Sequence, residues 1–211
     1  MKQSGFLYAI LLMLIIFICG GCLSVPSSPA PKYYTLHLTV NQDKVENKDI
    51  APQVIIGIGP VEIPEYQNRP QIVTRDKDGM LTFAQFDRWG EALDSGLARL
   101  ILERLAMVFP QAEFQMFPCN FSIPLDYQII INVIQLESQL DKDLFLMTQW
   151  TIVDSKTKKM LLTKRSEIHQ AITPRNYSGL AQALSKAVTL LSDEIAENLS
   201  FQSKAKAVMA Q

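Results

Sequence analysis

An apolar segment at the amino terminus, closed by a cysteine, constrains this chain more than any other feature. Lys2 gives the segment a positive start, residues 6–18 are almost entirely apolar, and Gly20 and Gly21 stand directly before Cys22. This layout is typical of a secretory signal with small residues at its cleavage site. We therefore predict that residues 1–21 are a signal peptide and that the rest of the chain folds in an oxidising compartment.

A cysteine placed directly after the small residues resembles the lipobox of bacterial lipoproteins, in which the thiol and the new amino terminus are acylated. The resemblance makes Cys22 the lipidation site, although Cys19 stands where lipoboxes usually carry leucine. Stable anchoring needs about two acyl chains, so three would hold the protein at a membrane. The residues after Cys22 lack the aspartate that retains enterobacterial lipoproteins in the inner membrane. The expected location is the outer membrane, with the domain facing the periplasm.

A single transmembrane helix is the alternative interpretation of the same segment. Residues 6–23 are close to the minimum length, since about 17 to 25 residues span a bilayer core. The Gly-Gly-Cys end and the lack of a basic stop after the apolar residues favour the lipoprotein interpretation.

The residues after the cysteine predict a tether followed by one domain. The segment LSVPSSPAPK, residues 23–32, is too rich in proline and serine to build a core and favours an extended spacer. At about 3.1 Å per residue it would hold the domain roughly 30 Å from the lipid. We therefore assign residues 22–32 to the lipidated cysteine and tether, 33–201 to a single domain, and 202–211 to a flexible tail.

Composition excludes several classes of function. The chain has 20 Lys and Arg against 21 Asp and Glu and no basic run, so nucleic acid is not an expected partner. Once Cys22 is lipidated, Cys119 is the remaining cysteine of the mature chain, so we expect neither an internal disulfide nor a cysteine-rich metal site. Cys119 is predicted to be a buried apolar residue, with intermolecular pairing as the alternative.

Hydrophobic periodicity predicts seven strands and two helices. Asp78-Gly79 marks a hairpin between the third and fourth strands, and Thr173 and Pro174 are expected to begin the second helix. The predicted strands are Tyr33–Val40, Val54–Ile63, Gln71–Arg75, Met80–Phe86, Tyr127–Leu136, Leu144–Val153 and Met160–Ala171, and the predicted helices are Trp89–Phe109 and Pro174–Leu199.

The order of these elements predicts an α+β fold. Short connections between successive strands require antiparallel pairing, and two helices with one apolar stripe each need a sheet face to cover. We expect a mixed or antiparallel sheet of about six to seven strands packed against two helices. Residues 109–124 hold four phenylalanines and a methionine in a predicted loop. They form either a flap over the core or an exposed patch for protein or lipid.

No catalytic motif is present in the sequence. His37 and His169 are its two histidines, and each falls at a polar step of a predicted strand, which favours a solvated side chain. Asp141 and Asp143 flank Lys142 and predict a hairpin turn rather than a metal site. No G-x-S-x-G, H-E-x-x-H or phosphate-binding loop occurs. We expect a protein without enzymatic activity, metal or cofactor.

Two motifs resemble those of the paraquat-inducible protein C family. Residues 63–75 contain P-x-Y-x-x-R-P-Q-I-V-x-R, and residues 86–93 contain W-G-E-x-L; Tyr33–Leu36 also match. The resemblance covers nearly the whole mature chain. Members are outer-membrane lipoproteins encoded beside MCE-domain lipid transporters and described as auxiliary components of ABC-type transport.

The resemblance implies a non-enzymatic lipoprotein that docks a periplasm-spanning MCE assembly at the outer membrane and aids phospholipid movement. Because MCE assemblies are rings, it also suggests a homo-oligomeric ring. A structural envelope lipoprotein without a role in lipid traffic is the alternative, and a periplasmic lipid hydrolase is a third possibility. Copurification of an MCE protein from membranes would separate the first two.

The motif residues also suit a rigid junction. Pro64 and Pro70 bracket a turn, Arg69 is predicted to pair with a carboxylate such as Glu91, and Trp89 is expected to pack over the corner. We interpret the cluster as mainly architectural. The candidate partner-binding residues within it are Tyr66, Arg69, Trp89 and Glu91.

Overall fold

The computed structural model of the chain describes residues 28–38, 47–50, 53–118 and 124–209. Residues 31–211 form one compact unit, which is described below; residues 1–30 form another. The predicted signal peptide, Cys22, most of the tether and Cys119 lie outside the described residues.

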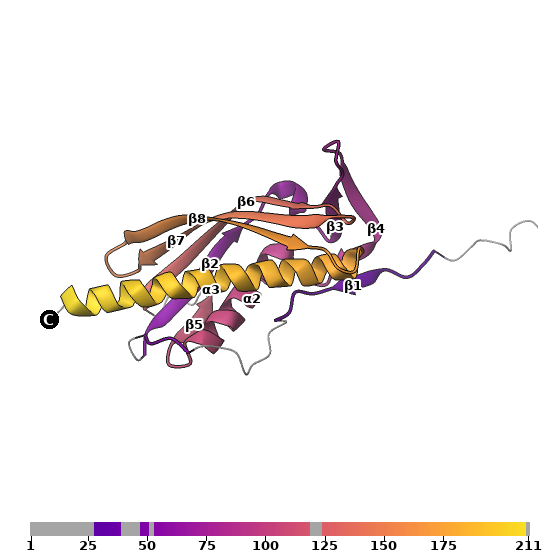
Figure 1. Cartoon of the computed structure of the whole chain (residues 1–211). Coiled ribbons are helices and arrows are strands. Elements are labelled where there is room, and N and C mark those ends of the chain that lie inside the picture. Colours follow the sequence, from indigo (N-terminus) through magenta and orange to yellow (C-terminus); the bar gives the residue numbers. More distant parts are fainter. Residues whose placement is uncertain (1–27, 39–46, 51–52, 119–123, 210–211) are drawn as a thin grey trace, which may run out of the picture. The chain divides into compact units, whose positions relative to one another are not determined.

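The described residues form eight strands and two α-helices, drawn in Figure 1. The strands are β1 (Lys32–Tyr34), β2 (Ile55–Glu62), β3 (Gln71–Arg75), β4 (Leu81–Trp89), β5 (Glu113–Met116), β6 (Tyr127–Ser138), β7 (Asp143–Asp154) and β8 (Lys159–Ala171). The helices are α2 (Leu93–Val108) and α3 (Tyr177–Met209), and a short 3-10 turn covers Glu65–Gln67.

The strands form two mixed sheets. The larger sheet has the order β5-β2-β6-β7-β8, in which β2 runs parallel to both β5 and β6 and the remaining pairs are antiparallel. The smaller sheet has the order β1-β4-β3, with β1 parallel and β3 antiparallel to β4. The α+β class and the two helices expected from the sequence are confirmed, with eight strands divided between two sheets.

The core lies between the larger sheet and the two helices. Alternate residues of β6 and β7 are buried, as expected for strands with one face on a core. Trp150 of β7 is fully buried, and its Nε1 donates to the Oγ of Ser166 in β8 at 2.8 Å. Apolar residues of α2 and α3 pack against this face, so both helices cover one side of the larger sheet (Figure 1).

The fourth strand divides its pairing between two neighbours. It pairs with β3 along residues 81–83 and again at Arg88, as the predicted hairpin requires, and residues Asp87–Trp89 also pair with β1 on the other side. Trp89 was predicted to begin the first helix, but it ends β4 because it pairs with Tyr34 of β1. The helix therefore begins at Leu93.

Other elements also differ from the sequence expectation. The first strand was predicted to span Tyr33–Val40, but β1 ends at Tyr34 and residues 35–38 are not strand. The predicted loop 109–124 contains β5, which pairs with β2. Helix α3 begins at Tyr177 rather than Pro174 because Asn176 caps it: the Asn176 Oδ1 accepts a hydrogen bond from the Gly179 N–H at 2.9 Å. The helix continues to Met209, past the predicted end at Leu199.

Candidate functional site

The motif residues meet at one corner of the domain, where the turn after β2 approaches the end of β4. The Gln67 side chain is buried, and its Nε2 donates to the carbonyl oxygen of Leu136 in β6 at 2.8 Å. The Gln67 N–H also donates to the Pro64 carbonyl at 2.8 Å, which closes the 3-10 turn. The turn is thus fixed to the larger sheet.

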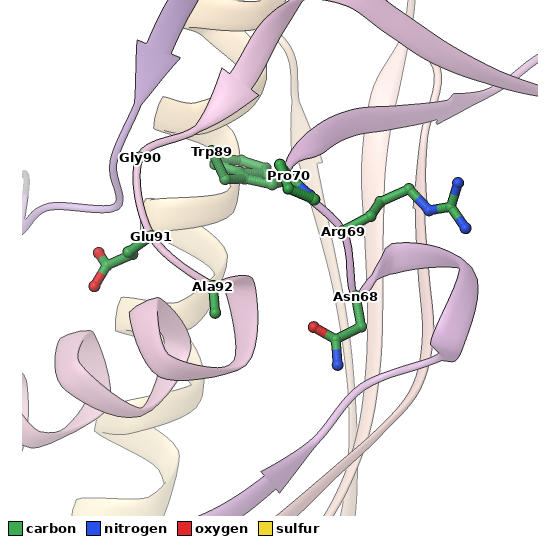
Figure 2. Close-up of a pocket in the computed structure, with 7 residues that line it drawn as sticks. All are labelled: Asn68, Arg69, Pro70, Trp89, Gly90, Glu91 and Ala92. Atoms are coloured by element: carbon green, nitrogen blue, oxygen red, sulfur yellow. The ribbon is translucent and has the colours of Figure 1, made fainter.

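The end of β4 joins this turn to the first strand. The Trp89 N–H donates to the Pro70 carbonyl at 2.7 Å, and the Gly90 N–H donates to the Tyr34 carbonyl at 2.7 Å. The Trp89 side chain is 6% exposed and lies beside Pro70 (Figure 2). Its Nε1 is buried without a hydrogen-bond partner among the described residues. Trp89 therefore packs over the corner, as predicted.

An open pocket of about 340 Å³ lies at this corner (Figure 2). Its rim is formed by backbone and side chains from the turn on one side and from the β4–α2 connection on the other. The lining residues are Asn68, Arg69, Pro70, Trp89, Gly90, Glu91 and Ala92. Three of the four candidate partner-binding residues therefore lie together at one pocket, whereas Tyr66 is not among the lining residues.

The predicted ion pair between Arg69 and Glu91 is wrong. Their side chains point in opposite directions (Figure 2). The Arg69 guanidinium lies 4.5 Å from the centre of the Phe83 ring, a cation–π contact. Glu91 instead accepts hydrogen bonds from Arg99 of α2. A basic residue on the following helix thus reaches Glu91, while Arg69 faces the neighbouring hairpin.

Arg99 is at the structural centre of the corner, and the sequence analysis did not identify this residue. Its Nη2 lies 2.5 Å from the Glu91 Oε1 and donates to the Leu36 carbonyl at 2.8 Å, and its Nη1 contacts Glu103 at 2.8 Å. Hydrogen bonding to Glu91 raises the pKa of the Arg99 guanidinium above its usual range, although burial opposes this. The i,i+4 spacing of Arg99 and Glu103 was the available sequence signal.

Arg75, the last motif residue, supports the hairpin beside the corner. Its guanidinium lies 5.7 Å from the centre of the Tyr66 ring, and its Nε lies 3.1 Å from the Glu137 Oε1. Its Nη1 also donates to the Gly79 carbonyl at 2.9 Å. Tyr66 is half-buried in this arrangement, so its aromatic ring mainly supports the motif from within.

A partly buried hydrogen bond fixes the first strand beside the pocket. The Tyr34 hydroxyl donates to the Asp87 Oδ1 at 2.7 Å. Burial, reinforced by this hydrogen bond, raises the pKa of Tyr34 to about 12. Burial and the charge of Asp87 also raise the pKa of Tyr177, at the start of α3. The hydrogen bond thus joins β1 to β4, and the charge of Asp87 acts on the start of α3.

The remaining candidate residues lie away from the corner. His37 and His169 are exposed, as predicted; His169 lies 3.7 Å from Asp143 and its ring stacks on Phe145 at 4.5 Å between centroids. Asp141 lies in the tight turn between β6 and β7, as predicted. Among the described residues, no three His, Cys, Asp or Glu side chains are grouped as metal ligands. None of the helices in the described part of the chain has the length and apolarity to cross a membrane.

The phenylalanine-rich segment combines both predicted roles. Phe109 is fully buried and Phe114 packs against the core, whereas Met116 and Phe117 are 39% and 40% exposed. Met116 and Phe117 line a second pocket, of about 300 Å³, together with residues at the start of α2. The described part of the segment thus covers the core and also exposes two apolar side chains, those of Met116 and Phe117.

The fold is shared with solved structures of distant sequence. The crystal structure of an uncharacterized protein matches with a TM-score of 0.66 and 15% identity, covering 81% of this chain and 99% of the other. A crystal structure from Xanthomonas campestris, of the family called DUF330, matches with a TM-score of 0.69 and 12% identity, covering 83% of this chain and 98% of the other. No curated protein matches the chain. These likenesses define the class of α+β domain.

The family follows from the sequence of the domain itself. The model of the ABC-type transport auxiliary lipoprotein component family matches residues 34–196. The chain belongs to this family and is therefore an auxiliary lipoprotein of ABC-type transport systems.

Proposed function

We propose that this chain is a lipoprotein similar to paraquat-inducible protein C, which docks a periplasm-spanning MCE assembly at the outer membrane and so assists phospholipid transport between membranes. The observation that carries the proposal is the corner pocket. The two motifs that give the resemblance, residues 63–75 and 86–93, supply all of its lining residues. If these motif residues only stabilised the core, we would not expect them to line a pocket that is open to solvent.

The corner has the properties of a protein-docking surface. Its base is a buried tryptophan, a residue type enriched where partners bind most tightly. Asn68, Pro70 and Ala92 are exposed around it and are available to a partner. The hydrogen bonds of Gln67 and Arg99 hold the two sides of the pocket in place, so a partner would meet a preorganised surface.

The anchor completes the proposal. Lipidation of Cys22 would leave residues 23–32 as a spacer between the lipid and the domain of residues 33–201. The default sorting of such a lipoprotein is to the outer membrane. A spacer of roughly 30 Å suits a domain that meets a partner arriving from the inner membrane.

We further propose that the domain acts without catalysis, metal or cofactor. Its exposed histidines lie outside the pocket, and the lining residues include no nucleophile beside a base. Because MCE assemblies are rings, a ring of this domain could match their symmetry. The second candidate function, an envelope lipoprotein that only organises the membrane, would require the same anchor but no MCE partner.

Site-specific photo-crosslinking in cells tests the docking proposal. A photoreactive residue at Asn68 or Ala92 of the full-length chain should form a covalent product that contains an MCE-domain protein. The control position is Thr157, which is exposed on the turn between β7 and β8. If Asn68 and Ala92 give no MCE product, or if Thr157 gives as much, the corner is not the docking site.

Labelling with a fatty-acid analogue tests the anchor separately. The wild-type chain should incorporate the label and fractionate with the outer membrane, and Cys22→Ala should lose both properties. Outer-membrane location without any MCE product from the corner or in copurification would favour the structural alternative. Retention of the leader would favour the transmembrane interpretation.

A further inference from the structure

The last strand of the larger sheet has a free edge. β8 ends the strand order and contains 13 residues, whereas β5, at the other edge, contains four. Within the described residues, β8 forms its backbone ladder with β7 alone. Its inner face remains tied to α3, since the Lys164 Nζ lies 2.6 Å from the Glu194 Oε1. A long edge of this kind can accept another strand.

Two opposite charges on the outer face of β8 have no partner within the described chain. Arg165 and Glu167 are both exposed and flank Ser166. They lie opposite Gln149 and Met147 of β7, which place both on the face turned away from the helices. Neither side chain forms an ion pair among the described residues. Each charge is therefore available to a group beside the edge.

The sequence of β8 is self-complementary about Ser166. In an antiparallel pair of strands, residues directly opposite each other point to the same face of the sheet. If the two strands are copies related by a two-fold axis perpendicular to the sheet, one residue must therefore lie opposite its own copy, and the axis passes between the two. With the axis at Ser166, Arg165 of each copy lies opposite Glu167 of the other. The residues further out, 164 with 168, 163 with 169 and 162 with 170, bring no like charges together.

Other positions of the axis fit less well. An axis at Lys164, Arg165 or Glu167 would set that residue opposite its own copy, and like charges directly opposite are destabilising. An axis before Lys164 would extend the pairing across the irregularity of β8 near residue 161, where its register with β7 shifts. An axis at Ile168 or later would shorten the paired length. Ser166 is the position that keeps a long ladder with two opposite-charge pairs.

We propose that two copies of this chain associate through β8, antiparallel, with the two-fold axis at Ser166. The two larger sheets then form one continuous sheet, and both copies keep their helices on the same side. Backbone hydrogen bonds supply the affinity, and the paired Arg165 and Glu167 fix the register. The corner pocket lies on other strands, so this association does not depend on the proposed docking function.

Charge reversal and charge exchange test the register. The measurement is sedimentation equilibrium of the full-length chain in detergent micelles. The variants Arg165→Glu and Glu167→Arg each set two pairs of like charges opposite each other and should raise the dimer dissociation constant about tenfold or more. The double variant Arg165→Glu/Glu167→Arg restores both pairs and should return the constant to within about threefold of wild type. Lys77→Glu, on the exposed turn between β3 and β4, is the control and should have no effect.

Three results would overturn the inference. The first is a wild-type chain that stays monomeric at every concentration, which would make the charges of β8 a protection against edge pairing. The second is a dimer that tolerates the single variants or is not restored by the exchange. The third is a larger ring that none of the variants affects. Circular dichroism of each variant excludes misfolding, and MCE crosslinking from Asn68 tests the docking proposal independently.

Discussion

Arg99 of α2 bridges two segments that are far apart in the sequence, because one of its nitrogens contacts both the Glu91 carboxylate and the backbone carbonyl of Leu36. Glu91 belongs to the corner pocket, and Leu36 follows the first strand. A single guanidinium therefore holds the pocket rim, the first helix and the entry of the chain in one arrangement.

Removal of this guanidinium should destabilise the domain. Arg99→Met is expected to lower the free energy of unfolding by about 2 kcal/mol, because it leaves the half-buried Glu91 carboxylate and the Leu36 carbonyl without their charged donor. Urea denaturation measures the change. Glu103→Gln removes only the i,i+4 pair on the helix surface and should cost no more than about 0.5 kcal/mol. Equal losses in the two variants would contradict the bridging role of Arg99.

A buried hydroxyl in the core offers a stabilising substitution. Thr148 of β7 is 1% exposed, and its Oγ1 has no hydrogen-bond partner among the described residues. Thr148→Val replaces this oxygen with a methyl group and is expected to raise the free energy of unfolding by about 1 kcal/mol. The control is Thr151→Val, since the Thr151 hydroxyl is hydrogen-bonded to Thr163 at 3.0 Å on the outer face. If Thr148→Val is the more destabilising of the two, an unseen partner satisfies the hydroxyl.

Gly179 is required by the close approach of the chain before α3. A β-carbon added there would lie 1.8 Å from the Pro174 carbonyl oxygen. Gly179→Ala should therefore lower the free energy of unfolding by more than about 2 kcal/mol, although alanine is favoured over glycine inside helices by about 1 kcal/mol. Thermal denaturation with Gly96→Ala as the matched variant tests this. At Gly96 the nearest atom is the Glu91 Oε1, at 3.3 Å, which would have to move by only a few tenths of an ångström, so the change should be much smaller.

The Tyr34 phenol should make stability fall at alkaline pH. Its folded-state pKa of about 12 exceeds the ordinary value of 10.0. The resulting contribution to stability is complete below pH 10 and is lost as the pH rises through 12. Absorbance at the tyrosinate band should reveal a late-ionising phenol that Tyr34→Phe removes. If the phenol that Tyr34→Phe removes ionises near the ordinary value of 10.0 instead, burial and Asp87 do not perturb this hydroxyl.

Local patterns predicted most elements of the fold. The alternation in β6, β7 and β8 and the apolar stripes of α2 and α3 place these elements within a few residues of their observed bounds, except for the long end of α3. Such periodicity depends on neighbours in the sequence. The parallel pairing of β1 with β4 and the existence of β5 depend on distant partners, which a single sequence does not specify.

The site was predicted in position but not in its contacts. The motifs identified the corner, and the burial of Trp89 followed from its size and place. Arg69 and Glu91 were paired because they have opposite charge within adjoining motifs, yet their side chains point in opposite directions. The true partner, Arg99, is eight residues beyond Glu91 and reaches it only because the helix begins after a strand that ends at Trp89.

The position of β1 decides where mechanical load enters the domain. Any tension on the lipid end of this lipoprotein would arrive at Lys32 and would be resisted first by the three-residue ladder with β4 and by the Tyr34 hydroxyl. From there the force would pass through Gly90 to the wall of the pocket without crossing the hydrophobic core. Under the proposed function, membrane attachment and partner attachment would therefore lie mechanically in series over a few residues, and strain between two membranes would load this corner before the rest of the fold.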